Sequence, residues 1–304
     1  MTIPTLINSR AAIPVQADRM SRLEDQIVRL QARIATGERF TEAAEAPAEA
    51  LRAAALERLT ARLDSDQRSI QRATTRLSLA ETALESANSI LMRATELALA
   101  AANGTSSAED RQIYRAEMLV LRQQMADAAN MRDEAGRYIF AGAASTQPAY
   151  APDADGVLRY QGRGAHAGAE AAGIGTAALP AAQSLFGPDG ADCFATLDGL
   201  VAALADGAEE SRTPAINAAL SGLSASSDRL AMGRAMVGAG MARLESDEAR
   251  IEAARMDASE AIADTRGLDL TTAIAQLSAL DLTLNAARAS FTRIFESTLF
   301  DRLG

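Results

Sequence analysis

The sequence feature that most constrains the fold is a row of large aliphatic residues that recurs at every seventh position. Alanines alternate with these residues along much of the segment. A seven-residue repeat keeps one stripe of an α-helix against a partner helix, so residues 48–102 are predicted to form one helix about 80 Å long. The row consists of Leu56, Leu63, Ile70, Leu77, Leu84 and Leu91.

The composition favours thin helical seams over a thick core. Hydrophobic residues make up 48% of the 304 residues, yet aromatic residues contribute only 4% and tryptophan is absent. Aromatic side chains bury the most area per residue, so their scarcity limits the core that the chain can build. The sequence therefore predicts a mainly α fold, an elongated antiparallel helical or coiled-coil rod with a small β-rich insertion.

Both ends of the chain carry an apolar stripe with spacings of three and four residues, which is the pattern of a coiled-coil seam. A single pair of such short helices is marginal in water, so we expect neighbouring molecules to cover the rest of this assembly seam. The first stripe consists of Met20, Leu23, Ile27, Leu30 and Ile34. The last stripe includes Leu270, Leu277, Leu280, Leu284, Phe291 and Ile294.

These patterns divide the chain into three regions. Residues 1–40 are expected to form a coiled-coil helix that pairs with residues 268–304. Residues 41–136 and 212–267 are expected to form the helical rod. Residues 137–211 are dense in glycine, proline and alanine, and they are expected to form a small β-rich or irregular insertion.

Helix start and stop signals mark the ends of the longest segments. Gly37 is placed to end the first helix, and Pro47 is placed to open the second, where its missing N–H costs nothing. Arg266 and Gly267 interrupt the later helical pattern. Asp269 is a suitable N-cap for the last helix, because its carboxylate can accept from free backbone N–H groups.

A short connection follows the long second helix. Residues 103–105 have the sequence Asn-Gly-Thr and are predicted to break it. Ser106 and Glu109 have the spacing of a capping box, which predicts the start of a third helix that ends near Gly136. So short a connection favours an antiparallel helical hairpin.

The insertion contains two strand-like segments. Residues 138–142 resemble a short strand, and residues 150–160 read as two strands about an Asp-Gly turn. Because the insertion looks irregular, we expect a partial deletion within residues 150–200 to be tolerated better than a change in the terminal seams.

The residue inventory excludes most site chemistry. Lysine is absent, His166 is the one histidine and Cys193 is the one cysteine, so a P-loop, a zinc site, a redox pair and an internal disulfide are all excluded. We predict no catalytic residue, no metal site and no cofactor. Glu209 and Glu210 are a pair of carboxylates on which an enzyme hypothesis would rest, although adjacent acids in a polar loop are usually solvated.

The charge and hydropathy exclude two kinds of partner. The net charge of −10 opposes the binding of nucleic acid, which needs a cationic surface. No uncharged segment that also lacks helix-breaking residues is long enough to span a membrane. We therefore expect no membrane insertion. The first residues show no basic segment followed by an apolar one, so we expect no cleavable secretory signal.

Several segments together resemble the bacterial flagellin superfamily, and within it the proteins that join hook to filament. Residues 34–39, Ile-Ala-Thr-Gly-Glu-Arg, resemble the end of the family's first helix, and residues 103–111 resemble its hairpin turn. Residues 136–142, Gly-Arg-Tyr-Ile-Phe-Ala-Gly, resemble the entry into the β domain of the junction proteins. Weaker matches cover residues 237–245 and 269–270.

The resemblance implies a structural protein of the flagellum, secreted unfolded through the flagellum's own export channel and located outside the cell at the hook–filament junction. It implies assembly through the two terminal helices, which would line the inner tube of the axial structure. The implied partners are further copies of this chain, the other hook-associated junction protein, flagellin and an export chaperone.

Two alternatives to a junction protein remain open besides the enzyme hypothesis. A flagellin of the filament belongs to the same structural class and differs in forming micrometre-long filaments. A cytoplasmic coiled-coil signalling adaptor belongs to another class, because heptads alone do not specify flagellar assembly.

Overall fold

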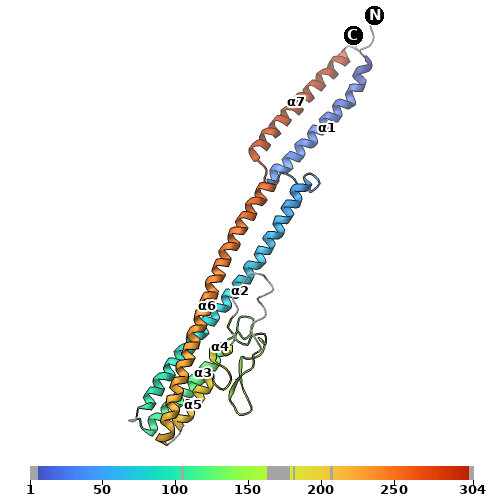
Figure 1. Cartoon of the computed structure of the whole chain (residues 1–304). Coiled ribbons are helices and arrows are strands. Elements are labelled where there is room, and N and C mark those ends of the chain that lie inside the picture. Colours follow the sequence, from blue (N-terminus) through green and yellow to red (C-terminus); the bar gives the residue numbers. More distant parts are fainter. Residues whose placement is uncertain (1–5, 104–105, 163–178, 181, 206–207, 301–304) are drawn as a thin grey trace. The chain divides into compact units, whose positions relative to one another are not determined.

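The computed structural model is mainly helical, and it describes residues 6–103, 106–162, 179–180, 182–205 and 208–300, with side chains from residue 14 to residue 293 within those ranges. In chain order the elements are α1 (Leu6–Thr36), α2 (Pro47–Ala102), α3 (Ala108–Ala129), β1 (Tyr150–Pro152), β2 (Leu158–Tyr160), α4 (Ala182–Phe186), α5 (Cys193–Ala205), α6 (Glu209–Arg266) and α7 (Leu270–Phe300) (Figure 1).

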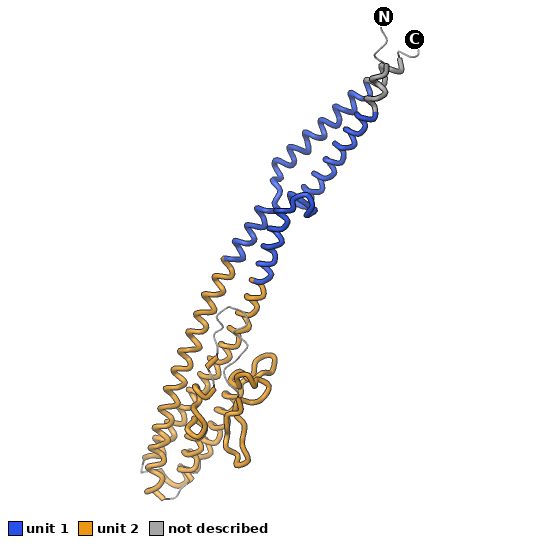
Figure 2. Tube along the Cα trace, turned by 45° about the vertical axis from the view of Figure 1, so that its right-hand side comes forward, with its two compact units in different colours: residues 1–62, 254–304 blue, residues 63–253 orange. Residues whose placement is uncertain are grey.

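The chain forms two compact units (Figure 2). The first unit comprises residues 1–62 and 254–304, which include α1, α7 and the adjoining ends of α2 and α6. The second unit comprises residues 63–253 and holds the remaining elements. The two long helices therefore contribute to both units.

The predicted ends of the long helices are confirmed. Gly37 ends α1 with a positive φ of 71°, a conformation that glycine adopts without steric cost. Pro47 is the first residue of α2. Asp269 caps α7, because its Oδ1 accepts from the N–H groups of Thr271 and Thr272 at 3.0 and 3.2 Å.

The predicted limits of the third helix are wrong at both ends. Its N-cap is Ser107 rather than Ser106, and Ser107 forms a capping box with Asp110. The helix ends at Ala129 rather than near Gly136. Asn130 is its C-cap, and the Asn130 side chain donates to the carbonyl of Tyr150 and accepts from the Tyr150 N–H, each at 2.9 Å.

The core of the second unit is built on the heptad row of α2. Ile70, Leu77, Leu84 and Leu91 are each at most 1% exposed. They belong to one buried cluster with a second heptad row on α6, which consists of Leu223, Leu230, Val237, Leu244 and Ile251. A Cβ at Gly233 of α6 would lie 2.2 Å from Leu185 of α4, so glycine is what lets these two helices approach.

The insertion contains the predicted hairpin and two helices that the sequence did not reveal. β1 and β2 pair antiparallel with Tyr150 opposite Tyr160, and Gly156 in the turn has φ of 77°. Residues 138–142 form buried turns rather than the expected strand, and Tyr138 forms an antiparallel bridge with Arg132. The additional elements are α4 and α5.

An aromatic cluster fills the core of this region. Phe186 lies edge-on to Phe140 and Tyr150, with ring centroids 5.6 and 5.8 Å apart, and Phe194 lies 4.7 Å from Tyr150. Cys193 is buried beside them, and this burial raises the pKa of its thiol. Part of the chain's small aromatic content is thus gathered in this region, while other aromatic residues such as Phe40 and Tyr114 lie elsewhere.

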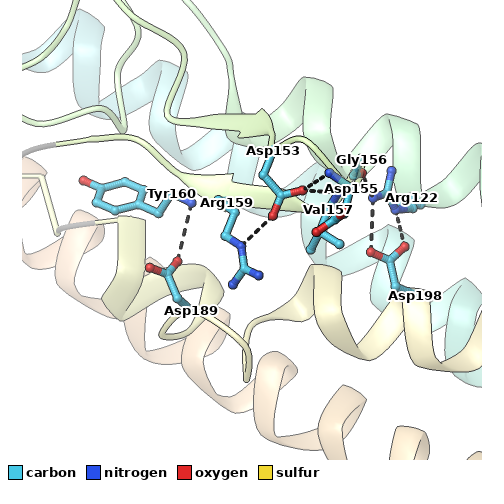
Figure 3. A network of polar contacts seen from close by, with 9 residues as sticks. All are labelled: Arg122, Asp153, Asp155, Gly156, Val157, Arg159, Tyr160, Asp189 and Asp198. Atoms are coloured by element: carbon cyan, nitrogen blue, oxygen red, sulfur yellow. Dashed lines mark hydrogen bonds and ion pairs between the residues drawn. The ribbon is translucent and has the colours of Figure 1, made fainter.

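Polar contacts tie the hairpin to its surroundings (Figure 3). Arg122 of α3 forms an ion pair with Asp198 of α5 and donates to the carbonyl of Gly156 at 3.4 Å. The carboxylate of Asp153 accepts from Arg159 Nε at 2.9 Å, and this hydrogen bond is the main cause that lowers the pKa of Asp153. The hairpin is therefore held on the helices rather than projecting freely.

Candidate functional site

The predicted pairing of the terminal helices is present in the first unit. α1 and α7 pack against each other as antiparallel neighbours (Figure 1). Ile27 of α1 and Ala273 and Leu284 of α7 are the most buried side chains of the pair, at 7%, 2% and 6% exposed. Arg288 of α7 donates to Glu24 of α1 outside this apolar contact.

Most of the predicted seam is only half-buried. Leu270 is 47% exposed and lies outside the contact, while Ile294 lies in α7 beyond the described side chains. The half-buried members are Met20, Leu23, Leu30, Ile34, Leu277, Leu280 and Phe291. One partner helix thus covers only part of each stripe.

Further apolar side chains of the pair face the solvent. Val28 on α1 is 63% exposed, and Ile274 and Leu282 on α7 are 52% and 72% exposed. Together with the half-buried stripes, these exposed apolar side chains leave apolar surface that a further partner can cover. The helix pair is therefore the candidate assembly surface of the first unit.

The turns that connect these helices form a second feature, which we call the clasp and define as residues 37–39 and 266–268. The two segments form one antiparallel β-bridge between Glu38 and Gly267. Each segment donates one backbone N–H to the other, from Arg39 to the carbonyl of Arg266 at 2.7 Å and from Leu268 to the carbonyl of Gly37 at 2.9 Å.

Ion pairs surround the clasp. Arg266 lies 3.1 Å from Glu57 and 3.6 Å from Glu38, and Arg33 lies 3.2 Å from Glu45. These side chains are between 25% and 49% exposed, and ion pairs that solvent reaches contribute little stability each. The two backbone hydrogen bonds therefore determine the geometry, and the ion pairs support it.

The sequence predicts the interruption at Gly267 but not the clasp. A Cβ at Gly267 would lie 2.4 Å from the carbonyl oxygen of Ala263, which is backbone and cannot move aside cheaply. The signal available was a glycine directly after the last residue of a long helix, but its partner segment is remote in sequence.

We expect Gly267→Ala to open the clasp. The methyl group would displace the backbone that donates to and accepts from residues 37–39, and the loss should be about 1–3 kcal/mol. Faster amide exchange at Arg39 and Leu268 would measure this opening. Gly199→Ala is the matched control, because Gly199 is an exposed residue of α5 and nothing lies within 4 Å of where its Cβ would be. Alanine at this position should stabilise the helix. Unchanged exchange in Gly267→Ala would contradict the steric argument.

Acid should loosen the same region. A hydrogen bond from the Thr41 N–H lowers the pKa of Glu45, and hydrogen bonds from the Thr272 side chain and N–H lower the pKa of Asp269. A carboxyl group whose pKa is lowered on folding stabilises the fold above its unfolded pKa of about 4, and this contribution is lost as pH falls through the folded value. Protection factors of the Thr41 and Thr272 amides should therefore fall below about pH 4; constant values from pH 6 to pH 3 would contradict this.

Other candidate chemistry finds no support in the described residues. Glu209 and Glu210 are exposed in the first turn of α6, and His166 lies outside the described residues. Over the described ranges no group of three histidine, cysteine or acidic side chains is arranged to hold a metal ion. Within the same ranges no helix is both long and apolar enough to cross a bilayer.

The helical part of the chain is similar to known flagellar proteins. Residues 7–145 match the model of the bacterial flagellin N-terminal helical region. Flagellar hook-associated protein 3 of Salmonella typhimurium is 33% identical over 117 residues, which are 38% of this chain and 36% of that protein. The protein of the same name from Escherichia coli is 34% identical over 111 residues, which are 36% of this chain and 34% of that protein. The match thus spans roughly a third of each relative.

Solved structures share the fold over more of the chain. A protein of Vibrio parahaemolyticus assigned to the flagellar hook-associated proteins has a TM-score of 0.67 and 19% identity, and the match covers 73% of this chain and 100% of that one. The junction protein FlgL of Legionella pneumophila has a TM-score of 0.54 and 16% identity, covering 62% of this chain and 99% of that one. The chain is therefore similar to the bacterial flagellin N-terminal helical region over residues 7–145 and shares the fold of these two solved structures.

Proposed function

We propose that this chain is a structural subunit of the bacterial flagellum that joins the hook to the filament and assembles through α1 and α7. The observation that carries the proposal is the partly covered apolar surface of the α1–α7 pair, in a chain that carries the flagellin N-terminal helical region. Half-buried leucine and isoleucine side chains gain further free energy when neighbours remove them from water. Packed copies of the same pair would supply those neighbours.

The proposed partners follow from the same resemblance. They are further copies of this chain, the other hook-associated junction protein, flagellin, and a chaperone that escorts the chain to export. The proposed location is outside the cell at the hook–filament junction, reached without a cleavable signal peptide. The similarity to hook-associated protein 3 supports this set of partners.

The function is tested by removing the chain. Cells without it should build hooks but hold no attached filaments, so they should lose swimming motility and release flagellin into the medium. Electron microscopy of the flagella and immunoblots of the medium measure both effects. Normal swimming with attached filaments would refute the proposed function.

A filament flagellin is the second candidate, because the matched family model is itself described as flagellin. The two candidates differ in the number of subunits in each flagellum. A junction protein should label a short zone next to the hook in immunogold images, whereas a flagellin should label the whole filament. A chain that stays in the cytoplasm of cells with intact export would instead favour a signalling adaptor.

A further inference from the structure

Two exposed charged groups of opposite sign lie on α2 and α6 in the first unit. Arg58 and Arg62 of α2 are four residues apart, and Asp257, Glu260 and Asp264 of α6 are spaced by three and four, so each group shares one helix face. All five side chains belong to exposed residues. Among the described residues none of the five forms an ion pair within the chain.

The arginines point away from the buried side of α2. Leu56 is half-buried and Ala53 is fully buried, and they mark the side of the helix that packs inward. Arg58 lies two residues after Leu56 and five residues after Ala53. At 3.6 residues per turn it projects roughly 140–160° from both. This outward surface, which we call the arginine face, consists of Leu51, Arg58 and Arg62.

The carboxylates are placed on α6 in the same way. Ala258 and Thr265 are 3% and 6% exposed and mark the buried side of the helix. Glu260 lies two residues after Ala258 and five residues before Thr265, so its side chain also projects roughly 140–160° from both of them. The surface that we call the acidic face consists of Met256 and Glu260, which project outward, and of Asp257 and Asp264, which project roughly 80–120° from the two buried residues.

The two faces lie at the same level of the first unit. Arg266 of α6 forms an ion pair with Glu57 of α2 at 3.1 Å, and the two helices run in opposite directions (Figure 1). The next turns of α2 therefore lie beside the preceding turns of α6. Because each charged face points away from its helix's buried side, the first unit carries basic and acidic groups on opposite outer surfaces.

Each face also carries an exposed apolar side chain. Leu51, which is 70% exposed, lies seven residues before Arg58 and so on the same side of α2. Met256, which is 63% exposed, lies four residues before Glu260 on α6. An apolar anchor beside charged groups is the composition of a protein–protein contact rather than that of a solvated helix surface.

We propose that the arginine face of one copy packs laterally against the acidic face of the next copy, with Arg58 and Arg62 meeting Asp257 and Glu260. The partner is a second copy because the two faces are complementary in charge and at one level, while the net charge of −10 otherwise makes copies repel. Since the two faces differ, the contact is heterologous and repeats from copy to copy in a ring or helical row. The inference rests on the proposed function and adds how neighbouring subunits recognise each other.

A charge exchange tests the contact. In cells lacking the native gene, one variant carries Arg58→Glu with Arg62→Glu, and the other carries Asp257→Arg with Glu260→Arg. Each variant alone should reduce attached filaments at least tenfold, because like charges then face each other at every contact. Co-expression should restore attachment, because copies of the two variants placed alternately meet opposite charges at every contact.

The control carries Arg115→Glu with Arg243→Glu, which changes the net charge as much as the first variant does, at exposed arginines of the second unit. It should keep native attachment, and circular dichroism should show that all variants are folded. Native attachment by either charge-reversed variant alone, or failure of the folded pair on co-expression, overturns the lateral contact. Neither result touches the proposed function, which fails instead if cells lacking the chain keep their filaments.

Discussion

Leu284→Asp should unpair α1 and α7 and abolish incorporation into the flagellum, while the second unit stays folded. The Leu284 side chain is 6% exposed, so the variant loses its apolar contacts and places a carboxylate in the contact between the two helices, where the nearby Arg288 already pairs with Glu24. The expected cost is about 3 kcal/mol or more, unless the helices separate and let water reach the charge. Leu30→Asp, at a half-buried position of α1, should act in the same direction with a smaller effect.

Amide exchange measures the unpairing, and counts of attached filaments measure incorporation. Protection should fall along α1 and α7 but not at Leu77 in the core of the second unit. Leu282→Asp is the matched control for the amide exchange alone, because Leu282 lies two residues away and is 72% exposed but belongs to the candidate assembly surface. Equal loss of protection in the aspartate variants at residues 282 and 284 would show that charge on α7, rather than burial in the seam, causes the unpairing.

Phe186→Ala should destabilise the second unit by about 3–5 kcal/mol. The ring is 1% exposed and contacts Phe140 and Tyr150, so alanine leaves a cavity at the centre of the aromatic cluster. Stabilities of ordinary domains are about 5–15 kcal/mol, so this loss is a large share of the total. Deletions that remove β1, β2, α4 or α5 should be at least as damaging, although composition alone suggested that deletions within residues 150–200 would be tolerated.

Urea unfolding followed by circular dichroism measures this loss as a lower midpoint. Met232→Ala is the control, because Met232 lies on α6 and its side chain is 70% exposed. Its midpoint should stay within experimental error of the native value. A similarly small shift for Phe186→Ala would mean that the insertion does not stabilise the helices.

Features that depend on residues close together in the sequence could be predicted. The ends at Gly37, Pro47 and Asp269 follow from backbone sterics and side-chain capping within a few residues. The capping box was misplaced by one residue because Ser106 and Ser107 are adjacent and an acidic residue follows each at the required spacing. Spacing alone does not distinguish such neighbours.

Features that depend on remote segments could not be predicted. The aromatic cluster combines residues from the hairpin, α4 and α5. None of these segments has a clear apolar repeat that would indicate which side is buried. In the terminal pair, Ile27 and Leu284 are buried, whereas Leu270 is exposed because it is the first residue of α7, next to the clasp. The clasp itself depends on backbone groups, which no side-chain pattern reports.

The clasp has a consequence for the order in which the chain folds. Its two segments come from opposite ends of the sequence, so bringing them together directly from the unfolded chain would require closing most of the polypeptide into a loop, with the corresponding loss of entropy. Once α2 and α6 lie antiparallel, only a few residues separate each segment from the nearest end of these helices, and closure becomes nearly local. The contact between α1 and α7 should therefore form last, after α2 and α6 have packed against each other.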